Sequence, residues 1–424
     1  MPQDHATPGA RHGLLRNFTS VLGANTVYRI SQWILVVFIA RWGSAHDVGQ
    51  FALAQALAAP VFLTVGLNLR AARATDVEDH WRPGTYHRLR HLVNVLALMV
   101  TMALGAVVSP TAGFLTVLGC LALSKASEAS SQLTYGLAQR VERLDVMAHS
   151  LLARSLLGTA AFAWTFYLER NLALACGMMA LSWGLITLVH DLPRERHLLR
   201  RHPPASRSDH GTWQSLAKEA LPLGMTAGIS SLTLNLPRYT VHAFMGSVAL
   251  GLFASLAYLG QTVQMITGSL SDSLIGRLAR SAQAGNQRQF VRTLLMLSGF
   301  SLAVSLVVVA GGALLGAPVI RLLLGPEYVN QPVLIALLTG SLFVTMQRVI
   351  GRGLQGGRRF KDIMLMDACT CVFTAIACVA AVPQWGLFGA AVASGAGWAL
   401  GSLVGLVRLH SMVRAMQPID TATA

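Results

Sequence analysis

The stretch that decides the fold is GLAQRVERLDVM at residues 136–147, because it returns without a gap at residues 353–364 as GLQGGRRFKDIM. Gly, Leu, Asp and Met recur in register, and Val146 corresponds to Ile363. Near the start of each half, RWGSAHDVGQFALAQAL (residues 41–57) corresponds to FMGSVALGLFASLAYL (residues 244–259) with a one-residue gap. A chain that repeats itself in segments too apolar for water predicts a transporter with two lobes and a site between them.

The composition is typical of a membrane protein. Apolar residues make up 53% of the chain and charged residues 12%, whereas soluble globular proteins carry about 25% charged residues. A helix that crosses the bilayer needs about 20 mainly apolar residues. The fold class that we expect is therefore all-α, with about twelve transmembrane helices, at roughly 18–40, 48–69, 91–109, 112–136, 146–168, 171–190, 217–244, 248–271, 293–316, 331–351, 362–382 and 385–409.

The longest hydrophilic break is DLPRERHLLRRHPPASRSDHGTWQSL at residues 191–216, in which Arg, His and Pro are clustered. We interpret it as a cytoplasmic linker between an N-terminal lobe at residues 1–190 and a C-terminal lobe at residues 217–424. Six predicted spans on each side give both lobes the same orientation in the membrane. The two halves are therefore expected to form a parallel repeat about an axis along the membrane normal.

The net charge of +15 reports topology rather than a nucleic-acid partner. Most Lys and Arg residues lie in the termini and in alternate loops, and the opposite loops hold only Arg41, Arg170 and Arg321. This positive-inside pattern predicts an inner-membrane protein with both termini in the cytoplasm. The extracytoplasmic loops are too short for a folded catalytic domain, and the five Cys residues are interpreted as small buried hydrophobes rather than metal ligands.

Charged residues inside predicted spans are costly and mark a pathway or a partner. Arg29 lies near the centre of the first span, and Asn25 and Gln32 share its helical face at i, i+4 and i+7 spacing. In the span at 217–244, Asn235, Arg238 and His242 form a similar stripe with Ser231. We predict that these residues line a water-filled cavity, although interhelical hydrogen bonding is the alternative for such stripes. Arg29 is the first candidate for binding a substrate, Arg238 the second and Arg154 a distant third.

Two carboxylates are candidates for ion coupling. Glu128 lies one turn from Lys125 in the span at 112–136, and we interpret the two as a neutralised structural pair, with coupling as the minor alternative. Asp272 ends the span at 248–271, where contact with solvent explains it equally well. Arg348, near the end of its own span, can reach the membrane interface.

The sign of the charges predicts the sign of the substrate. Glu128 is the only deep carboxylate that we identify, so an exporter of cations, which needs an unpaired Asp or Glu, is disfavoured. A cavity lined by Arg and amides favours an anion, most simply a phosphate or a diphosphate. The sequence contains no GxSxG, HExxH or Walker motif, so we expect no enzyme activity and no cofactor, and transport that is ion-coupled, potential-driven or downhill.

Two segments of the chain resemble a known family of membrane proteins. NLPRYTVHAFMGSVALGLFASLAYL at residues 235–259 and APVIRLLLGPEYVNQPVLIALL at residues 317–338 resemble the flippases of lipid-linked oligosaccharides, within the multidrug/oligosaccharidyl-lipid/polysaccharide (MOP) exporter superfamily. The resemblance implies two six-helix bundles that alternate between inward and outward states around a cationic cavity. By span, it places Arg29 and Arg238 at that cavity. The drug-exporter branch typically has an acidic residue in its first helices, and this chain has Arg29 there instead.

The function that we predict is a flippase for an undecaprenyl-diphosphate-linked oligosaccharide in surface polysaccharide synthesis, with a polysaccharide polymerase and chain-length machinery as possible partners. An ion-coupled multidrug exporter and a non-transporting component of an export complex are the alternatives. A membrane glycosyltransferase is a further rival, which the short extracytoplasmic loops disfavour. The sequence specifies neither the glycan nor the coupling ion.

Overall fold

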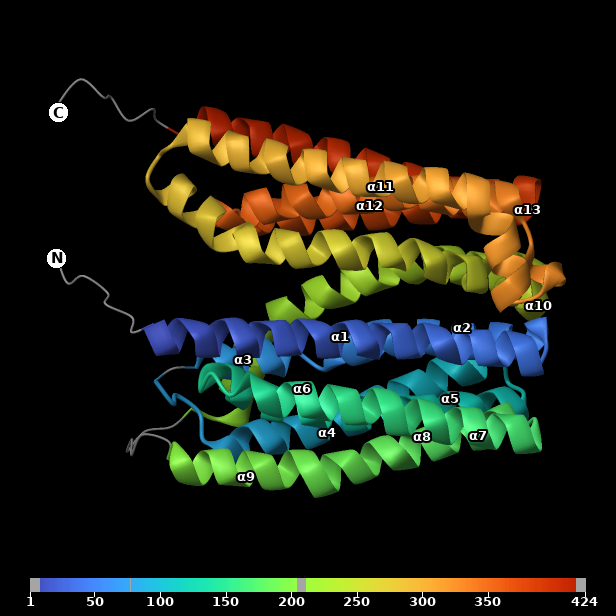
Figure 1. Ribbon diagram of the computed structural model, residues 1–424, viewed down its shortest axis with the longest axis horizontal. Coiled ribbons are helices and arrows are strands. Elements are labelled where there is room, and N and C mark those ends of the chain that lie inside the picture. Colours follow the sequence, from blue (N-terminus) through green and yellow to red (C-terminus); the bar gives the residue numbers. More distant parts are fainter. Residues whose placement is uncertain (1–7, 77, 204–210, 417–424) are drawn as a thin grey trace. The chain divides into compact units, whose positions relative to one another are not determined.

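The computed structural model describes residues 8–76, 78–203 and 211–416, with the side chains of 8–19, 22, 261–273, 275 and 276 left out. These described residues form helices and turns without a strand (Figure 1). Eight of the described helices are long and apolar enough to cross a membrane. The all-helical membrane fold is therefore confirmed, while the count of twelve spans stays a prediction. The contacts divide the chain into two compact units, which are described separately.

Unit 1 comprises Met1–Gly43 and Ala54–Gly228. Its membrane helices are antiparallel neighbours connected by short turns, and two of them change locally to π-helix. The elements are α1 (Pro8–Trp42), the end of α2 (Ala45–Val65), α3 (Leu69–Thr75), α4 (Pro83–Val108), α5 (Ala112–Arg140), α6 (Leu144–Ala153), η1 (Arg154–Gly158), α7 (Thr159–Glu169), α8 (Leu172–Ile186), η2 (Thr187–Asp191), α9 (Leu192–Arg201) and the start of α10 (Trp213–Gln283). One core cluster joins α3, α4 and α5 to the start of α10 through Leu69, Tyr86, Leu133 and Leu216.

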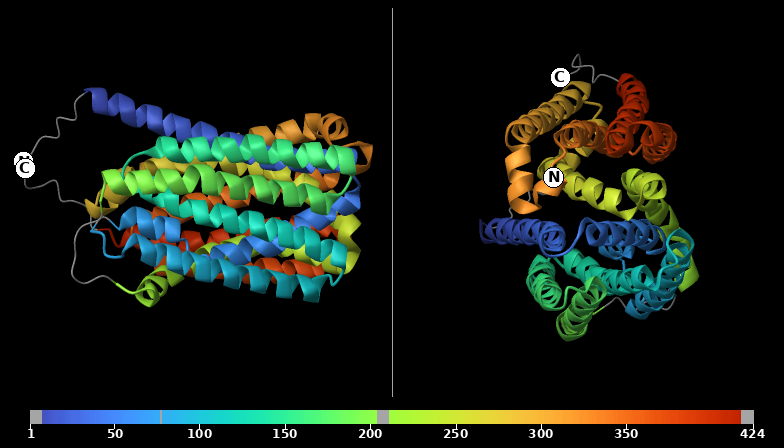
Figure 2. Two further views of the ribbon diagram at one scale, coloured as in Figure 1. Left: turned by 90° about the horizontal axis from the view of Figure 1, so that it is seen from below. Right: turned by 90° about the vertical axis from the view of Figure 1, so that its right-hand side faces the viewer.

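Unit 2 comprises Ser44–Leu53 and Ile229–Ala424. It contains the rest of α10, followed by α11 (Gln287–Leu323), η3 (Pro326–Tyr328), α12 (Gln331–Gly356) and α13 (Phe360–Arg414). The end-on view of Figure 2 shows α11, α12 and α13 packed together. Their shared core includes Phe290, Leu297, Leu354 and Met366.

Two glycines divide the longest helices. Gly246 in α10 has φ 80° and ψ −176°, and Gly386 in α13 has φ 56° and ψ −136°. Glycine adopts positive φ without a steric penalty, so the chain can reverse there. The first break falls between the predicted spans 217–244 and 248–271. The break at Gly386 lies three residues after Pro383 and just inside the predicted span 385–409. Pro383 itself is part of the helix before the break.

Residues 44–53 of the first repeated segment pack directly against the second, at residues 244–259, within unit 2. A Cβ atom added to Gly49 would lie 1.8 Å from the Ser247 carbonyl oxygen, and one added to Gly251 would lie 1.9 Å from the Ala45 carbonyl oxygen. Small residues allow membrane helices to approach backbone to backbone. This contact explains why Ser44–Leu53 belongs to unit 2 although the neighbouring parts of the chain belong to unit 1.

Two parts of the predicted linker at residues 191–216 are helical, at 191–201 and from Trp213 onward. The helix that begins at Leu172 continues through α9 to Arg201, and α10 begins at Trp213. Glu195 and Leu198 are buried in this continuation, and Leu198 packs with Leu137. The hydrophilic composition of this segment is therefore compatible with an amphipathic helix, one face of which packs within unit 1. The lobe boundaries at 1–190 and 217–424 stay a prediction.

Candidate functional site

A cationic pocket of about 320 Å³ lies wholly within unit 1. Its volume is at the lower end of the range for small-molecule sites, about 300–1,000 Å³. Three cations, Arg70, Arg90 and Lys125, and one carboxylate, Glu128, line it. The other lining residues are apolar, small or amide-bearing: Ala59, Phe62, Leu63, Gly66, Asn68, Leu69, Ala129 and Gln132. Positive charge is therefore in excess in a pocket formed by membrane helices.

A tight turn between α2 and α3 brings Arg70 to the pocket. Leu67 and Asn68 adopt left-handed backbone angles, with φ 56° and 44°, and α3 begins directly after them. The Arg70 guanidinium donates to the Gln132 Oε1 atom at 3.2 Å and contacts the Met147 sulfur at 3.3 Å. Neither partner is charged, so the positive charge of Arg70 remains available to a ligand.

Arg90 is the most unusual residue of the pocket. Its side chain on α4 is 3% exposed, and its Nε atom is buried without a hydrogen-bond partner. Among the described side chains no carboxylate pairs with it. Burying a charge without a partner costs several kcal/mol, as an order of magnitude. An anion from outside the protein would remove this cost.

Arg73, one turn from Arg70 on α3, has the opposite surroundings. It is also 3% exposed, but it forms an ion pair with Glu195 at 2.6 Å. The Glu195 carboxylate also contacts His87 at 2.8 Å and accepts a hydrogen bond from Thr134 at 2.8 Å. Arg73 is therefore part of the core of unit 1, which distinguishes it from Arg90.

Lys125 and Glu128 form the ion pair that their spacing suggests. The Lys125 Nζ atom lies 2.9 Å from Glu128 Oε2, and the Tyr28 hydroxyl donates to Glu128 Oε1 at 2.9 Å. Tyr28 belongs to α1, so this carboxylate connects the wall of the pocket to the first helix. The coupling role considered for Glu128 stays a prediction.

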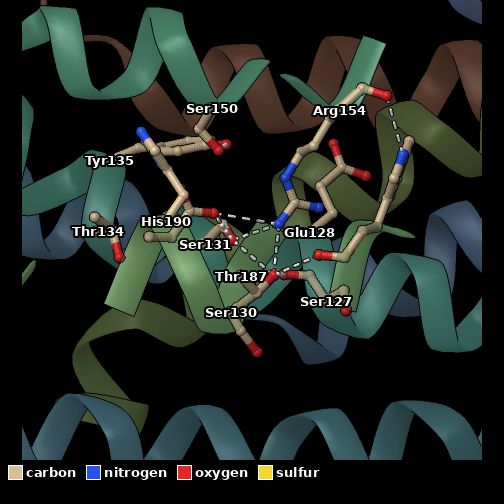
Figure 3. A network of polar contacts seen from close by, with 12 residues as sticks. Ser127, Glu128, Ser130, Ser131, Thr134, Tyr135, Ser150, Arg154, Thr187 and His190 are labelled. Carbon is tan, nitrogen blue, oxygen red and sulfur yellow. Dashed lines mark hydrogen bonds and ion pairs between the residues drawn. The ribbon is translucent and has the colours of Figure 1, made fainter. Parts of the chain in front are cut away.

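Arg154 lies in a buried polar network next to the pocket helices (Figure 3). It is 1% exposed, and its Nη2 atom donates to Ser131 at 2.6 Å, to Thr187 at 2.6 Å and to Asp191 at 3.3 Å. Arg154 begins the π-helical turn η1, and Asp191 ends the second one, η2. A ligand cannot reach the side chain in this conformation. The contacts support a structural role for Arg154, in contrast to its proposed place at the substrate.

The polar stripe predicted in the first span is partly exposed. Arg29 is exposed on α1 and forms no hydrogen bond or ion pair with any side chain that the structure describes. Gln32 is partly buried on the same helix. Asn25 donates to the carbonyl oxygen of Val21 at 3.0 Å, a bond within its own helix. The structure thus leaves Arg29 free to contact a ligand, and its role stays a prediction.

The second predicted stripe lies in unit 2, on α10. Arg238 is 8% exposed, donates to Asn235 Oδ1 at 2.8 Å and stacks on the Tyr258 ring at 5.0 Å. Asn235 donates in turn to the Ser231 carbonyl oxygen at 2.8 Å. The Nδ1 atom of His242 is buried without a partner. The structure therefore brings Arg238 and Asn235 together, while the side chain of Asp272 lies outside the described ones.

Sequence reasoning missed three ionisable residues. Arg70 and Arg90 fall between predicted spans, where they were attributed to the positive-inside pattern. Asp367 lies on α13 inside the predicted span 362–382, and it pairs with no cation among the described side chains. From the sequence we name Glu128 as the deep carboxylate and do not consider Asp367. All three lie within one or two turns of a predicted span boundary. Near such a boundary, hydropathy cannot distinguish a buried charged residue from an exposed one.

The chain is similar in sequence to proteins of polysaccharide biosynthesis. The family model for polysaccharide biosynthesis proteins matches residues 14–282. The capsular polysaccharide biosynthesis protein CapF of Staphylococcus aureus is 22% identical over 387 residues, which cover 89% of this chain and 95% of CapF.

Solved structures share the fold at lower identity. A MATE-family multidrug resistance transporter of the MOP superfamily has a TM-score of 0.67 at 14% identity, with 92% of this chain and 96% of that chain covered. The lipid II flippase MurJ has a TM-score of 0.65 at 13% identity, with 91% and 86% covered. These neighbours are transporters and flippases rather than enzymes. The chain therefore belongs to the polysaccharide biosynthesis protein family and has the fold of the MOP-superfamily transporters.

Proposed function

We propose that this protein is a flippase that moves a polyprenyl-diphosphate-linked oligosaccharide across the bacterial inner membrane during synthesis of a surface polysaccharide. The observation that carries the proposal is the cationic pocket of unit 1, with Arg90 buried in it without an anionic partner. Two similar proteins support it, since CapF is a capsular polysaccharide biosynthesis protein and MurJ is a lipid II flippase.

The pocket has the chemistry that a diphosphate requires. Guanidinium groups bind phosphate oxygens through paired, charge-assisted hydrogen bonds, and an ammonium group adds a point charge. Arg70 and Arg90 supply two guanidinium groups that pair with no carboxylate among the described side chains, and Lys125 adds an ammonium group that it shares with Glu128. A cationic drug would be repelled by the same groups, so the pocket disfavours the multidrug-exporter alternative.

The remaining parts of the proposal come from the sequence. Arg29, Arg238 and the amides of Asn25, Gln32 and Asn235 are proposed to contact the headgroup or sugars as the two lobes alternate in access, with His242 beside them. Both termini are proposed to lie in the cytoplasm. A polysaccharide polymerase and chain-length machinery are the proposed partners on the far side of the membrane.

The test compares two arginines on one helix. Arg90→Ala should lower export of surface polysaccharide about 10- to 100-fold, because a hydrogen bond to a charged group contributes about 1.5–3 kcal/mol. Arg90→Lys should fall between alanine and wild type, since lysine keeps the charge and loses the bidentate geometry. Export is measured as surface polysaccharide per cell, normalised to the amount of flippase in the membrane.

Arg88→Ala is the matched control, because Arg88 lies two residues away on α4 and is exposed. Its export should equal that of the wild type. Equal export by Arg90→Ala and Arg88→Ala, at equal abundance, would remove the pocket from the proposal.

A further inference from the structure

Asp367 is a membrane carboxylate with neutral surroundings. It lies on the first half of α13 and is partly buried. The Ser230 hydroxyl donates to its Oδ2 atom at 3.1 Å, and the Gln347 amide donates to its Oδ1 atom at 3.2 Å. These partners come from α10 and α12, so three helices of unit 2 meet at this carboxylate.

Three other carboxylates on described helices have a cation nearby. Glu128 pairs with Lys125 at 2.9 Å, Asp191 with Arg154 at 3.3 Å and Glu195 with Arg73 at 2.6 Å. Asp367 forms no ion pair within the part of the chain that the structure describes. An ionised carboxylate in a bilayer is expensive unless it is paired, and a proton can neutralise it instead of a cation.

A second layer of residues holds the partners of Asp367 in place. The Thr370 hydroxyl lies 3.0 Å from Gln347 Oε1 and 2.8 Å from the Met366 carbonyl oxygen, so it supports the amide that faces Asp367. Gly401, on the second half of α13, provides the space: a Cβ atom there would lie 1.8 Å from Thr370 Oγ1 and 2.8 Å from Gln347 Oε1. The site is therefore packed from both halves of α13.

The charged groups on the surrounding helices contact other residues, are exposed, or lie more than one turn away along the chain. Lys361, six residues before Asp367, is exposed, and Arg352, five residues after Gln347, donates to Gln355 at 2.9 Å. Asp362, five residues before Asp367, contacts Arg359 at 2.7 Å and Arg408 at 3.9 Å. Arg348 follows Gln347 on α12 but is exposed, on a different face of the helix from the buried Gln347. On α10, the nearest ionisable residues to Ser230 are Arg238 and His242 on one side and Glu219 and Lys218 on the other.

We infer that Asp367 is a proton-binding site of unit 2, which takes up and releases one proton in each transport cycle. The ionised carboxylate accepts hydrogen bonds from Ser230 and Gln347. When a proton from water binds to a carboxylate oxygen, the Ser230 hydroxyl can rotate and accept the new O–H, because a hydroxyl serves as donor or acceptor. Both protonation states thus keep a hydrogen-bonded partner. The inference goes beyond the proposed function, since it names the coupling ion and holds for any substrate.

Infrared difference spectroscopy of the purified, full-length protein tests the site without substrate. Many carboxylates of the chain gain a C=O band when the pH is lowered, so the prediction concerns one component of it, which the wild type should show and Asp367→Asn should lack. Asp362→Asn is the matched control on the same helix, because Asp362 is paired with Arg359. It should retain that component. A wild type without a titrating carboxyl band, or an unchanged band in Asp367→Asn, would overturn the inference.

Gly401→Ala provides a second variant that leaves the carboxylate present. The added methyl group displaces Thr370 and Gln347, so the band should shift in frequency and titrate at a different pH. An identical band in this variant would show that Thr370 and Gln347 do not influence the protonation of Asp367.

Transport into proteoliposomes, with undecaprenyl diphosphate as the probe, separates this inference from the proposed function. An imposed proton gradient should accelerate translocation in the wild type, and the acceleration should be lost in Asp367→Asn. Acceleration by a sodium gradient alone would overturn proton coupling and leave the flippase function standing. If the probe is not moved at all, recognition of the diphosphate alone is contradicted, while the infrared result still decides whether Asp367 binds a proton.

Discussion

At the scale of single residues, two buried arginines of unit 1 have opposite surroundings. Both have a buried Nε atom without a hydrogen-bond partner, but Arg154 donates to Ser131, Thr187 and Asp191, whereas Arg90 pairs with no carboxylate among the described side chains. A paired buried charge contributes to the fold, since removing one partner leaves the other uncompensated. An unpaired one only costs stability, so its presence needs a reason outside folding. The anion-binding role proposed for Arg90 gives such a reason.

This contrast predicts opposite effects on stability. Arg154→Leu should lower the free energy of unfolding by about 3–5 kcal/mol, because Asp191 is left buried without its cation. Arg90→Leu should leave the free energy of unfolding unchanged or raise it, because an uncompensated charge is removed. Denaturant or thermal unfolding of both variants in one detergent measures the difference. Similar losses for the two variants would show that Arg90 also has a structural partner.

At the scale of helices, α2 and α10 approach each other backbone to backbone through the repeated segments. Gly49 and Gly251 occupy corresponding places in the two repeated segments, and each meets a backbone carbonyl of the other segment. A side chain of any size at either position collides with backbone, which moves less easily than a side chain. The repeated motif therefore has a packing explanation at this place.

Gly251→Ala should lower the free energy of unfolding by at least about 1–3 kcal/mol, the usual range for overpacking. Gly299→Ala is the matched control in the same unit, because nothing lies within 4 Å of the position that its Cβ would occupy. The control should be neutral or slightly stabilising, since alanine is the better helix former. Thermal unfolding in detergent distinguishes the two, and equal midpoints would contradict the close approach.

The sequence predicts the helices well and the polar site only in part. Runs of apolar residues identify membrane helices because the bilayer imposes length and composition. The pairing of Arg154 with Asp191 spans 37 residues and joins two helices, which periodicity within one helix cannot reveal. Arg90 was counted as a loop charge because it lies at the start of an apolar run. Asp367 lies inside a predicted span, five residues from its start, and its partners Ser230 and Gln347 come from two other helices, which the pattern of one helix cannot reveal.

At the scale of the whole molecule, each of the two units has a polar cluster of its own. Unit 1 holds the cationic pocket, and unit 2 holds Asp367 with its neutral partners. A transporter couples two events when both bias the same conformational equilibrium. In the proposed cycle, the anionic headgroup acts on the first unit and a proton on the second. Substrate and coupling ion would then be bound at separate places in one chain.

The most direct test of the flippase proposal is the pool of lipid-linked oligosaccharides in a strain that lacks this gene and has no redundant flippase. The proposal predicts that surface polysaccharide falls while undecaprenyl-linked units accumulate on the cytoplasmic face. The wild-type gene and Arg88→Ala should restore the normal pool, and Arg90→Ala should not. An unchanged pool with normal surface polysaccharide would contradict the proposal and favour the drug-exporter alternative.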